Sequence, residues 1–386
     1  MLHCPDMVGG HAPQLARAER SLGVRAWCVA LEASPYGYMP DEILMSPGQG
    51  RIARGLGRLS LLLRALKDFD VVHFNFGSSI FPPRPVQYQP HLLGRQLGML
   101  LAEVYRSTLC MRDLALLKRA GKAIFVTYQG DDARQGDYCR AHFDTHFVHE
   151  VETDYYPEGS DAVKRKAISA FARFADGIFA LNPDLLYVLP AHANFVPYAN
   201  VDVKEWQPVP VTGNAGRPLS IVHAPSHRLV KGSRYLFEAV TQLKAEGVSI
   251  ELKLVENLPR SEARALYERA DVVVDQLLAG WYGGLAVEAM ALAKPVIAYL
   301  READLRFVPE PMRRELPIIN ANPQTIRAVL KSLATMERDT LAEIGLRSRV
   351  FVEKWHDPER VAAMMVEHYS AALVRQIEGR GRPGGM

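Results

Sequence analysis

The chain has 386 residues, of which 48% are hydrophobic and 23% are charged, and its formal net charge is +3. This length exceeds the ~250–300 residues beyond which a single core usually splits, so two domains are expected, and the balanced charge argues against a dedicated nucleic-acid binder. The four cysteines form no CxxC pair and no metal-ligand spacing, which predicts reduced thiols in a cytoplasmic protein.

Short β-rich runs alternate with longer amphipathic runs in the first half of the chain, which predicts βαβ units around a parallel sheet. The expected strands lie at 24–31, 70–76, 123–129, 177–181 and 193–199. The expected helices lie at 10–23, 52–69, 113–121 and 161–175. No basic segment followed by an apolar one opens the chain, and no run of ~18 uncharged apolar residues occurs, so neither a signal peptide nor a transmembrane helix is expected.

The second half repeats this alternation. Its expected strands lie at 218–224, 249–255, 270–277 and 294–300, and its expected helices at 233–247, 261–270 and 285–293. A polar stretch with prolines and glycines, 201–220, separates the two series and is the predicted linker. We therefore predict an N-terminal domain over 1–202 and a C-terminal domain over 203–355. A C-terminal helix over 356–378 is expected to pack back on the N-terminal domain, and 379–386 is an expected disordered tail.

A basic loop follows the first expected strand of the second half. Within 221–240, cations crowd around the expected start of a helix: His223, His227, Arg228, Lys231 and Arg234. Cations oppose the helix dipole there, so their presence indicates a bound anion held by backbone N–H groups, Lys231 and Arg228. A solvated basic loop is the alternative.

A second helix start lies in the stretch 277–300. Gly283 and Gly284 would let a phosphate approach the backbone, and Glu288 follows about one turn later. A carboxylate beside a diphosphate site suits the vicinal hydroxyls of a ribose. A glutamate that interacts favourably with the helix dipole, beside a tight turn, is the alternative. Two such helix starts in one domain are what a nucleoside diphosphate needs.

The segments "HRLVKG" (227–232) and "GWYGGLAVEAMALAKPVI" (280–297) resemble the donor-nucleotide motifs of GT-B glycosyltransferases, specifically the retaining family 4. Weaker matches run through most of the chain. The resemblance implies an α/β GT-B fold in which two Rossmann-like, doubly wound domains face a cleft. It places Lys231 at the pyrophosphate, Gly283 at the motif glycine and Glu288 at the ribose. The donor site that it implies comprises Gly9, Gly10, Ser226, Arg228, Lys231, Gly280, Tyr282, Gly283, Gly284, Leu285 and Glu288.

The chain departs from the family motif at two positions. Gly280 stands where the family has a glutamate that faces the transferred sugar. The family's arginine-to-lysine spacing leads to Ser226, whereas this chain has Arg228 closer to Lys231. With Trp281 and Tyr282 adjacent, we hypothesise a sugar pocket formed by ring faces.

The N-terminal half supplies the other side of the expected cleft. Gly9 and Gly10 resemble the family's glycine loop, with a plain tight turn as an equal alternative. "VTYQGDDAR" (126–134) resembles a cleft segment in which Gln129 replaces a histidine. Asp131 or Asp132 would orient an acceptor hydroxyl, unless the segment is an ordinary Asp-rich turn. Neither these aspartates nor the histidines of 139–152 are predicted to bind a metal.

The expected function is metal-independent sugar transfer, with retention, from a nucleoside-diphosphate sugar to a glycan, lipid-linked or protein acceptor, without a cofactor. Lys231, Arg228, Gln129, Asp131 and Asp132 are the candidate catalytic residues. A non-catalytic nucleotide-sugar-binding protein is the alternative, and a dehydrogenase is disfavoured because no GxGxxG follows a strand. The basic, leucine-rich segment 84–122 would be a core-facing helix, a lid over the acceptor cleft, or a contact with the inner face of a membrane.

Overall fold

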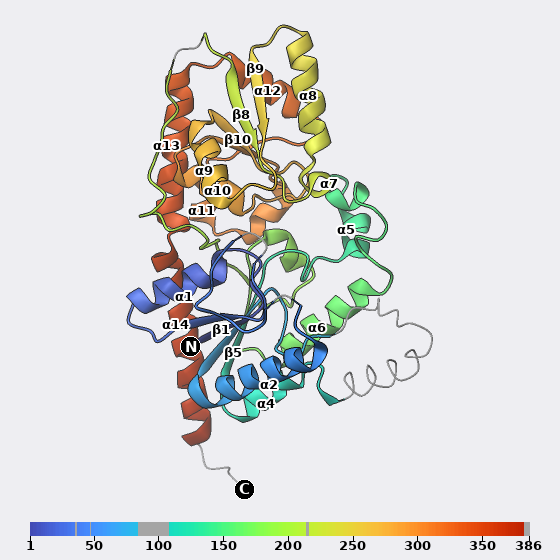
Figure 1. The fold of residues 1–386 in the computed structure, drawn as a ribbon, viewed down its shortest axis with the longest axis vertical. Helices are drawn as coiled ribbons and strands as arrows, with labels where there is room; N and C mark the ends of the chain where they lie inside the picture. The colour runs from blue at the N-terminus through green and yellow to red at the C-terminus, as the bar shows by residue number, and fades with distance from the viewer. Residues whose placement is uncertain (35–36, 47, 84–107, 214–215, 382–386) are drawn as a thin grey trace.

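The computed structural model describes residues 1–34, 37–46, 48–83, 108–213 and 216–381. Two α/β domains follow one another along the long axis of the molecule (Figure 1). Each domain contains one sheet whose strands are all parallel, with helices on both faces.

The N-terminal sheet has seven strands in the order β3-β2-β1-β4-β5-β6-β7. Its strands are β1 (Leu2–Pro5), β2 (Trp27–Ala30), β3 (Glu42–Ile43), β4 (Val71–Asn75), β5 (Ala123–Tyr128), β6 (Gly177–Ala180) and β7 (Asn194–Phe195). Its helices are α1 (His11–Ser21), α2 (Arg51–Asp68), α4 (Arg112–Arg119), α5 (Gly136–His142) and α6 (Ser160–Phe174).

The C-terminal sheet has five strands in the order β12-β11-β10-β8-β9. Its strands are β8 (Leu219–His223), β9 (Ile250–Leu254), β10 (Val272–Val274), β11 (Val296–Ala298) and β12 (Ile319–Asn320). Its helices are α7 (Arg228–Lys231), α8 (Ser233–Ala245), α9 (Arg260–Arg269), α10 (Gly284–Ala291), α11 (Glu310–Arg314), α12 (Ile326–Ala334) and α13 (Arg338–Trp355).

The central strands are buried on both faces. Every residue of β4 and β5 is buried, which is the state of a parallel sheet covered by helices and explains why apolar residues predominate on both faces of these strands. Phe74, Ile124 and Val126 belong to the core on one face of the N-terminal sheet, and Phe125 and Phe179 to the core on the other. The nine expected strands are confirmed, each shortened at one or both ends.

The strand orders place a switch point in each sheet. In the N-terminal sheet the order reverses between β1 and β4, and in the C-terminal sheet it reverses between β8 and β10. Ligands of doubly wound sheets bind at the carboxyl ends of the strands beside such a reversal. The loops that follow β1, β8 and β10 lie beside these reversals, and they line one cavity.

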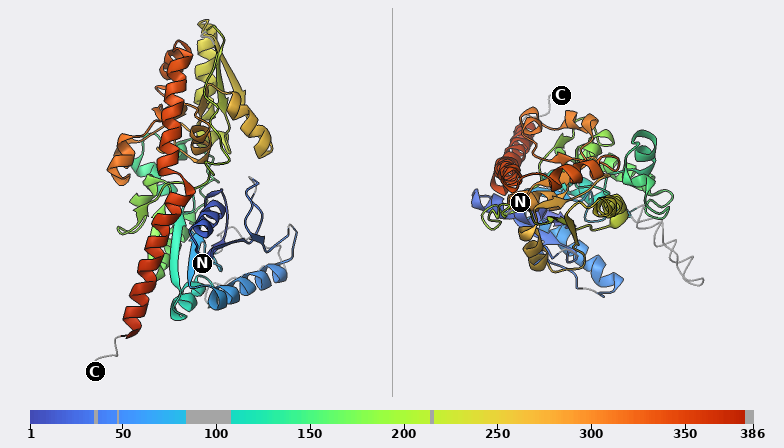
Figure 2. Two further views of the ribbon diagram at one scale, coloured as in Figure 1. Left: turned by 90° about the vertical axis from the view of Figure 1, so that its left-hand side faces the viewer. Right: turned by 90° about the horizontal axis from the view of Figure 1, so that it is seen from above.

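The chain returns to the N-terminal domain at its end. Helix α14 (Pro358–Gly381) follows α13 and packs against α1 through Val361, Met365 and Tyr369 (Figure 2). It includes 379–381, which we expected in a disordered tail, and 382–386 lie outside the described residues.

Two further expectations concern segments between elements. The predicted linker is packed, because Val201, Val203 and Trp206 are buried in the core of the C-terminal domain. Residues 84–107 of the basic segment lie outside the described residues, and residues 112–119 form α4. Among the helices that the structure describes, none is long and apolar enough to cross a membrane.

Candidate active site between the two domains

A cavity of about 480 Å³ lies between the two domains, at both switch points. Loops after β1, β5, β8 and β10 line it. Of the residues predicted from the sequence, it is lined by Gly9, Gly10, Gln129, Asp131, Ser226, Lys231, Gly283 and Gly284. The predicted residues that do not line it are Asp132, Arg228, Gly280, Tyr282, Leu285 and Glu288.

The first turn of α1 opens onto this cavity. A Cβ atom at Gly10 would lie 2.6 Å from Cε1 of Tyr38 and 3.0 Å from the carbonyl oxygen of Asn200, so only glycine fits at that position. The neighbouring His11 accepts a hydrogen bond at Nδ1 from the Ala199 N–H, at 3.0 Å. Burial lowers the pKa of His11 to about 3, so the ring is neutral and its proton is on Nε2.

Lys231 lines the cavity, as does a second cation, Arg134. The Nζ of Lys231 donates to Oδ1 of Asp275 at 2.9 Å and to Oε1 of Gln276 at 2.8 Å. These two bonds use two of the three ammonium protons and fix the position of the charge. Gly232, in the left-handed region with φ +73°, ends α7 directly after this lysine.

Asp275 occupies the helix start that we predicted to hold a phosphate. Its side chain is fully buried, and its Oδ2 accepts the N–H of Gly283 at 2.5 Å. Asp275 thus already compensates the charge of Lys231 and accepts the N–H of the residue that precedes α10. The N–H groups of Gly284 and Leu285, at the first two positions of α10, have no acceptor within the helix.

Arg228 does not face the cavity, which corrects its predicted role at the phosphate. Its guanidinium makes two hydrogen bonds to Glu256, at 2.8 and 2.5 Å, on the exposed side of α7. Ser226, the position to which the family spacing led, lines the cavity instead.

Glu288 is covered by a residue from the other domain. Its Oε1 accepts hydrogen bonds from the Tyr38 hydroxyl at 3.2 Å and from Arg260 at 3.0 Å. Burial raises the pKa of Glu288, although Arg260 and Tyr38 both act to lower it. The predicted ribose carboxylate is therefore formed at the expected place on α10 but shielded from the cavity by Tyr38.

The aromatic pair beside the glycines is part of the core, which corrects the prediction of a pocket lined by ring faces. Trp281 and Tyr282 are buried and stacked, with ring centroids 4.4 Å apart. The hydroxyl of Tyr282 lies 2.8 Å from Nε2 of His356. At Gly280, with φ +82°, a Cβ would lie 2.6 Å from Nη1 of Arg301. Neither the rings nor a side chain at residue 280 can reach a sugar here.

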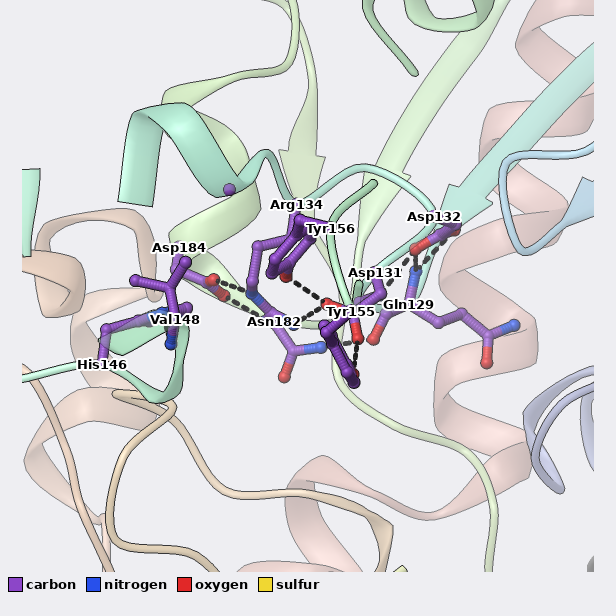
Figure 3. Close-up of polar contacts among 12 residues, drawn as sticks. Gln129, Asp131, Asp132, Arg134, His146, Val148, Tyr155, Tyr156, Asn182 and Asp184 are labelled. Carbon is purple, nitrogen blue, oxygen red and sulfur yellow. Dashed lines mark hydrogen bonds and ion pairs between the residues drawn. The ribbon is translucent and has the colours of Figure 1, made fainter. Parts of the chain in front are cut away.

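The two adjacent aspartates have different roles (Figure 3). Asp131 lines the cavity and accepts from the hydroxyls of Tyr155 at 2.5 Å and Tyr156 at 2.9 Å. Burial alone would raise the pKa of Asp131, but Arg134 and the two hydroxyls outweigh it, and the pKa lies below its ordinary value. Asp131 is thus an ionised carboxylate at the cavity.

Asp132 caps the turn in which it lies, which agrees with the alternative that this segment is an ordinary Asp-rich turn. Its carboxylate accepts the N–H groups of Gln129 at 3.1 Å and Gly130 at 2.7 Å. Burial raises the pKa of Asp132 to about 6 despite these bonds. It therefore shapes the loop that presents Gln129 and Asp131, and does not itself line the cavity.

Several residues at the cavity were missed in the sequence. Tyr38, Asn182, Asn200, Gln276 and Phe147 line it, and Asp275 lies directly behind it. Asp275 and Gln276 after β10, and Asn182 after β6, stand at the carboxyl ends of strands, and that position could have marked these three. In the described part of the chain, no three His, Cys, Asp or Glu residues are grouped to hold a metal ion.

Neither a protein-family model nor a curated protein matches the sequence of this chain. Solved structures do resemble it over nearly its whole length. Sucrose-phosphate synthase from Thermosynechococcus elongatus matches with a TM-score of 0.58 and 16% identity, over 97% of this chain and 100% of that one. The catalytic domain of starch synthase IV from Arabidopsis thaliana, bound to ADP and acarbose, matches with a TM-score of 0.57 and 10% identity, over 97% and 99%. HepE of Anabaena in complex with UDP-glucose matches with a TM-score of 0.56 and 12% identity, over 96% and 100%.

The chain has the GT-B fold. The two doubly wound domains, with a cavity where their switch points meet, are the arrangement that the sequence predicted.

Proposed function

We propose that this GT-B protein is a glycosyltransferase that uses a nucleoside-diphosphate sugar. One observation carries the proposal: Lys231 and the starts of helices α1 and α10 converge on the same interdomain cavity. Helix starts and a fixed ammonium suit the diphosphate of a donor, whose charge increases as the sugar leaves. The names of two structures with the same fold, one with UDP-glucose and one with ADP, support this ligand class.

Each side of the cavity has a proposed role. The C-terminal domain (203–355) holds the donor through Lys231 and the free N–H groups of α10, and Glu288 binds the ribose once Tyr38 has moved. The N-terminal domain (1–202) holds the acceptor.

Transfer proceeds with retention and without a metal ion. The bond between the sugar and the diphosphate breaks, a bond to the acceptor oxygen forms, and the acceptor proton passes to the departing diphosphate. Positioning and electrostatic stabilisation supply most of the rate acceleration.

The acceptor is a glycan, a lipid-linked glycan or a protein, and its hydroxyl lies near Asp131. This ionised side chain is the one carboxylate among the described residues that line the cavity. An ionised carboxylate accepts hydrogen bonds only, so it can orient a hydroxyl group of an incoming sugar or acceptor. Gln129, from the same loop, has both a donor and an acceptor for the same task.

A non-catalytic nucleotide-sugar-binding protein is the second candidate. It is favoured by Gly280, where Arg301 leaves no room for the sugar-facing carboxylate of the family, and by Asp275, whose charge opposes a second anion at α10. The two candidates differ in one measurable property, which is turnover of the donor.

The test compares two cations of helix α7, one on the cavity and one away from it. Lys231→Gln removes the charge and keeps a donor for Asp275, and Arg228→Gln is the matched control on the exposed side. UDP, GDP and ADP are screened by thermal shift, and the matching nucleotide sugars are screened for hydrolysis or transfer. We expect one nucleotide to raise the Tm of the wild type and of the control, but not that of Lys231→Gln. Binding without turnover would favour the second candidate, and wild-type turnover by Lys231→Gln would refute the proposal.

A further inference from the structure

Strand β9 (Ile250–Leu254) forms one edge of the C-terminal sheet. It pairs with β8 on one side, and among the strands that the structure describes none pairs with its other side. Helix α8 lies next to the strand (Figure 1), yet all residues of β9 except Ile250 remain at least partly exposed. An open edge of this kind presents unpaired backbone groups to which another strand can bond.

The backbone groups on the open side of β9 belong to alternate residues. Directly beside the strand, Ser249 accepts a backbone hydrogen bond from β8 at 3.0 Å, and Val255 donates one to β8 at 2.9 Å. Successive residues of a strand turn their N–H and C=O groups to opposite sides, so the odd-numbered residues of β9 face β8. The residues whose backbone groups point outward are therefore Ile250, Leu252 and Leu254.

The side chains on the exposed face of β9 carry opposite charges. Glu251 and Lys253 flank Leu252, both are exposed, and no described residue forms an ion pair with either. The residues opposite them in β8 are Ser220 and Val222, which carry no charge. Both charges are therefore available to a strand that adds to this edge.

We propose that β9 pairs with β9 of a second copy of this chain, antiparallel, around a two-fold axis at Leu252. Glu251 of each copy then faces Lys253 of the other, and Ile250 faces Leu254. Every outward N–H and C=O group of the strand finds a partner, because the outward residues face one another. The two charged pairs occupy the non-hydrogen-bonded positions, where side chains approach most closely. The interface is isologous and does not depend on the proposed function.

Charge selects both the register and the occupant of the edge. If the axis moves by one residue, Glu251 faces Glu251 or Lys253 faces Lys253, and like charges directly opposite are unfavourable. A lysine on an edge strand commonly prevents such pairing. Here a glutamate two residues earlier supplies its complement, so the strand that fits best is an inverted copy of β9 itself.

The test is sedimentation of the full-length protein over a range of concentrations. A short strand pair is a small interface, so we expect a reversible dimer with a Kd in the micromolar range. Lys253→Glu should raise this Kd by about tenfold or more, because two attractive pairs become repulsive. Glu251→Lys should do the same. Since both side chains are exposed, the Tm of the dilute variants should equal that of the wild type.

Two combinations of these substitutions should restore the dimer. Glu251→Lys/Lys253→Glu exchanges the charges, so opposite signs face each other again. A mixture of the two single variants should form a heterodimer, because one strand is then basic and the other acidic at both positions. A role of the two side chains within the monomer alone predicts neither rescue.

Matched controls reverse exposed charges in the other domain. Glu158→Lys and Lys166→Glu should dimerise like the wild type, since both residues are exposed and lie outside the C-terminal sheet. A wild type that remains monomeric at about 200 μM would overturn the proposal. Single variants that dimerise like the wild type would place the contact elsewhere, and a mixture without heterodimers would refute the antiparallel register.

Hydrogen exchange distinguishes a second copy from other occupants of the edge. Protection of the N–H groups of 250–254 should increase with protein concentration and disappear in Lys253→Glu. Protection that is the same at every concentration would show that another segment of the same chain covers β9, which would also overturn the proposal.

Discussion

The hydroxyl of Tyr38, in the N-terminal domain, donates a hydrogen bond of 3.2 Å to Oε1 of Glu288, in the C-terminal domain. Arg260 donates to the same oxygen at 3.0 Å, and its guanidinium lies 4.7 Å from the centre of the Tyr38 ring. A carboxylate that binds ribose accepts hydrogen bonds from hydroxyl groups, and here a phenol takes the place of one of them. Donor binding and the contact between Tyr38 and Glu288 should therefore compete.

Removing the phenol should strengthen nucleotide binding. Tyr38→Phe removes the hydroxyl that competes with the ribose for Glu288. A hydrogen bond to a charged group contributes about 1.5–3 kcal/mol, and the partial exposure of Tyr38 reduces this contribution here. We expect the Kd for the preferred nucleoside diphosphate to fall by about threefold to tenfold, measured by calorimetry. Tyr267→Phe is the control, since among the described residues only Tyr38 and Arg260 bond to this carboxylate. Weaker binding by Tyr38→Phe would show that the phenol contacts the nucleotide itself.

Restoring the family's carboxylate should fail. Gly280→Glu forces a side chain into a backbone conformation with φ +82° and into the guanidinium of Arg301, 2.6 Å from the new Cβ. Strain of this type costs about 1–3 kcal/mol, so the midpoint of thermal unfolding should drop by several degrees without a gain in transfer. Gly9→Ala is the control for stability, because no atom lies within 4 Å of its added Cβ. A stable and faster Gly280→Glu variant would contradict the geometry.

Asp131 should affect transfer and spare donor binding. Asp131→Asn keeps the shape of the side chain but removes the charge that Arg134, Tyr155 and Tyr156 stabilise. We expect the rate of transfer to fall by about a hundredfold, because a misplaced reacting group typically costs that much. The Kd for the nucleotide should stay within about twofold of wild type.

The pH profile offers a second check on this carboxylate. Because the pKa of Asp131 lies below its ordinary value, transfer should not decline through its protonation above pH ~4. Equal losses of transfer and nucleotide binding in Asp131→Asn would place Asp131 at the donor instead.

The sequence predicted the elements better than the directions of their side chains. Segments rich in apolar residues, such as β4 and β5, mark buried parallel strands. Glycines mark close approaches of the backbone, so the fold and the position of the site could be predicted. Lys231 and Arg228 are chemically alike and three residues apart, and only the turn of α7 decides which one faces the cavity. Strand β1 was missed because four residues with a histidine, a cysteine and a proline show no apolar run.

Contacts between distant segments were the other source of error. The burial of Trp281 depends on Phe195, the last residue of β7 in the N-terminal sheet. The two ring centres lie 5.7 Å apart. The cover over Glu288 depends on Tyr38, separated from it by 250 residues. Local spacing contains no information on either contact.

Acidification should destabilise the C-terminal domain through His223. Its Nδ1 lies 2.8 Å from the carbonyl oxygen of Val274, its Nε2 lies 2.8 Å from Oγ of Ser233, and the ring is fully buried between β8, β10 and α8. Burial lowers the pKa of His223 from 6.5 to about 4. Between these values the unfolded chain binds a proton that the folded one does not, so stability is complete above pH 6.5 and declines as the pH falls towards 4.

The expected slope is about 1.4 kcal/mol per pH unit, or about 3 kcal/mol over the window. His223→Gln lacks the titrating group, so the free energy of unfolding of this variant, from urea denaturation, should be lower at neutral pH and fall less steeply on acidification. His192→Gln, at an exposed histidine, should reproduce the wild-type slope. Other buried histidines have pKa values lowered in the same direction, such as His356 at about 4, so the steepness lost in His223→Gln measures one group among several. Parallel profiles for wild type and His223→Gln would mean that the ring at the switch point is protonated in the fold, and its two hydrogen bonds would then need both nitrogens as donors.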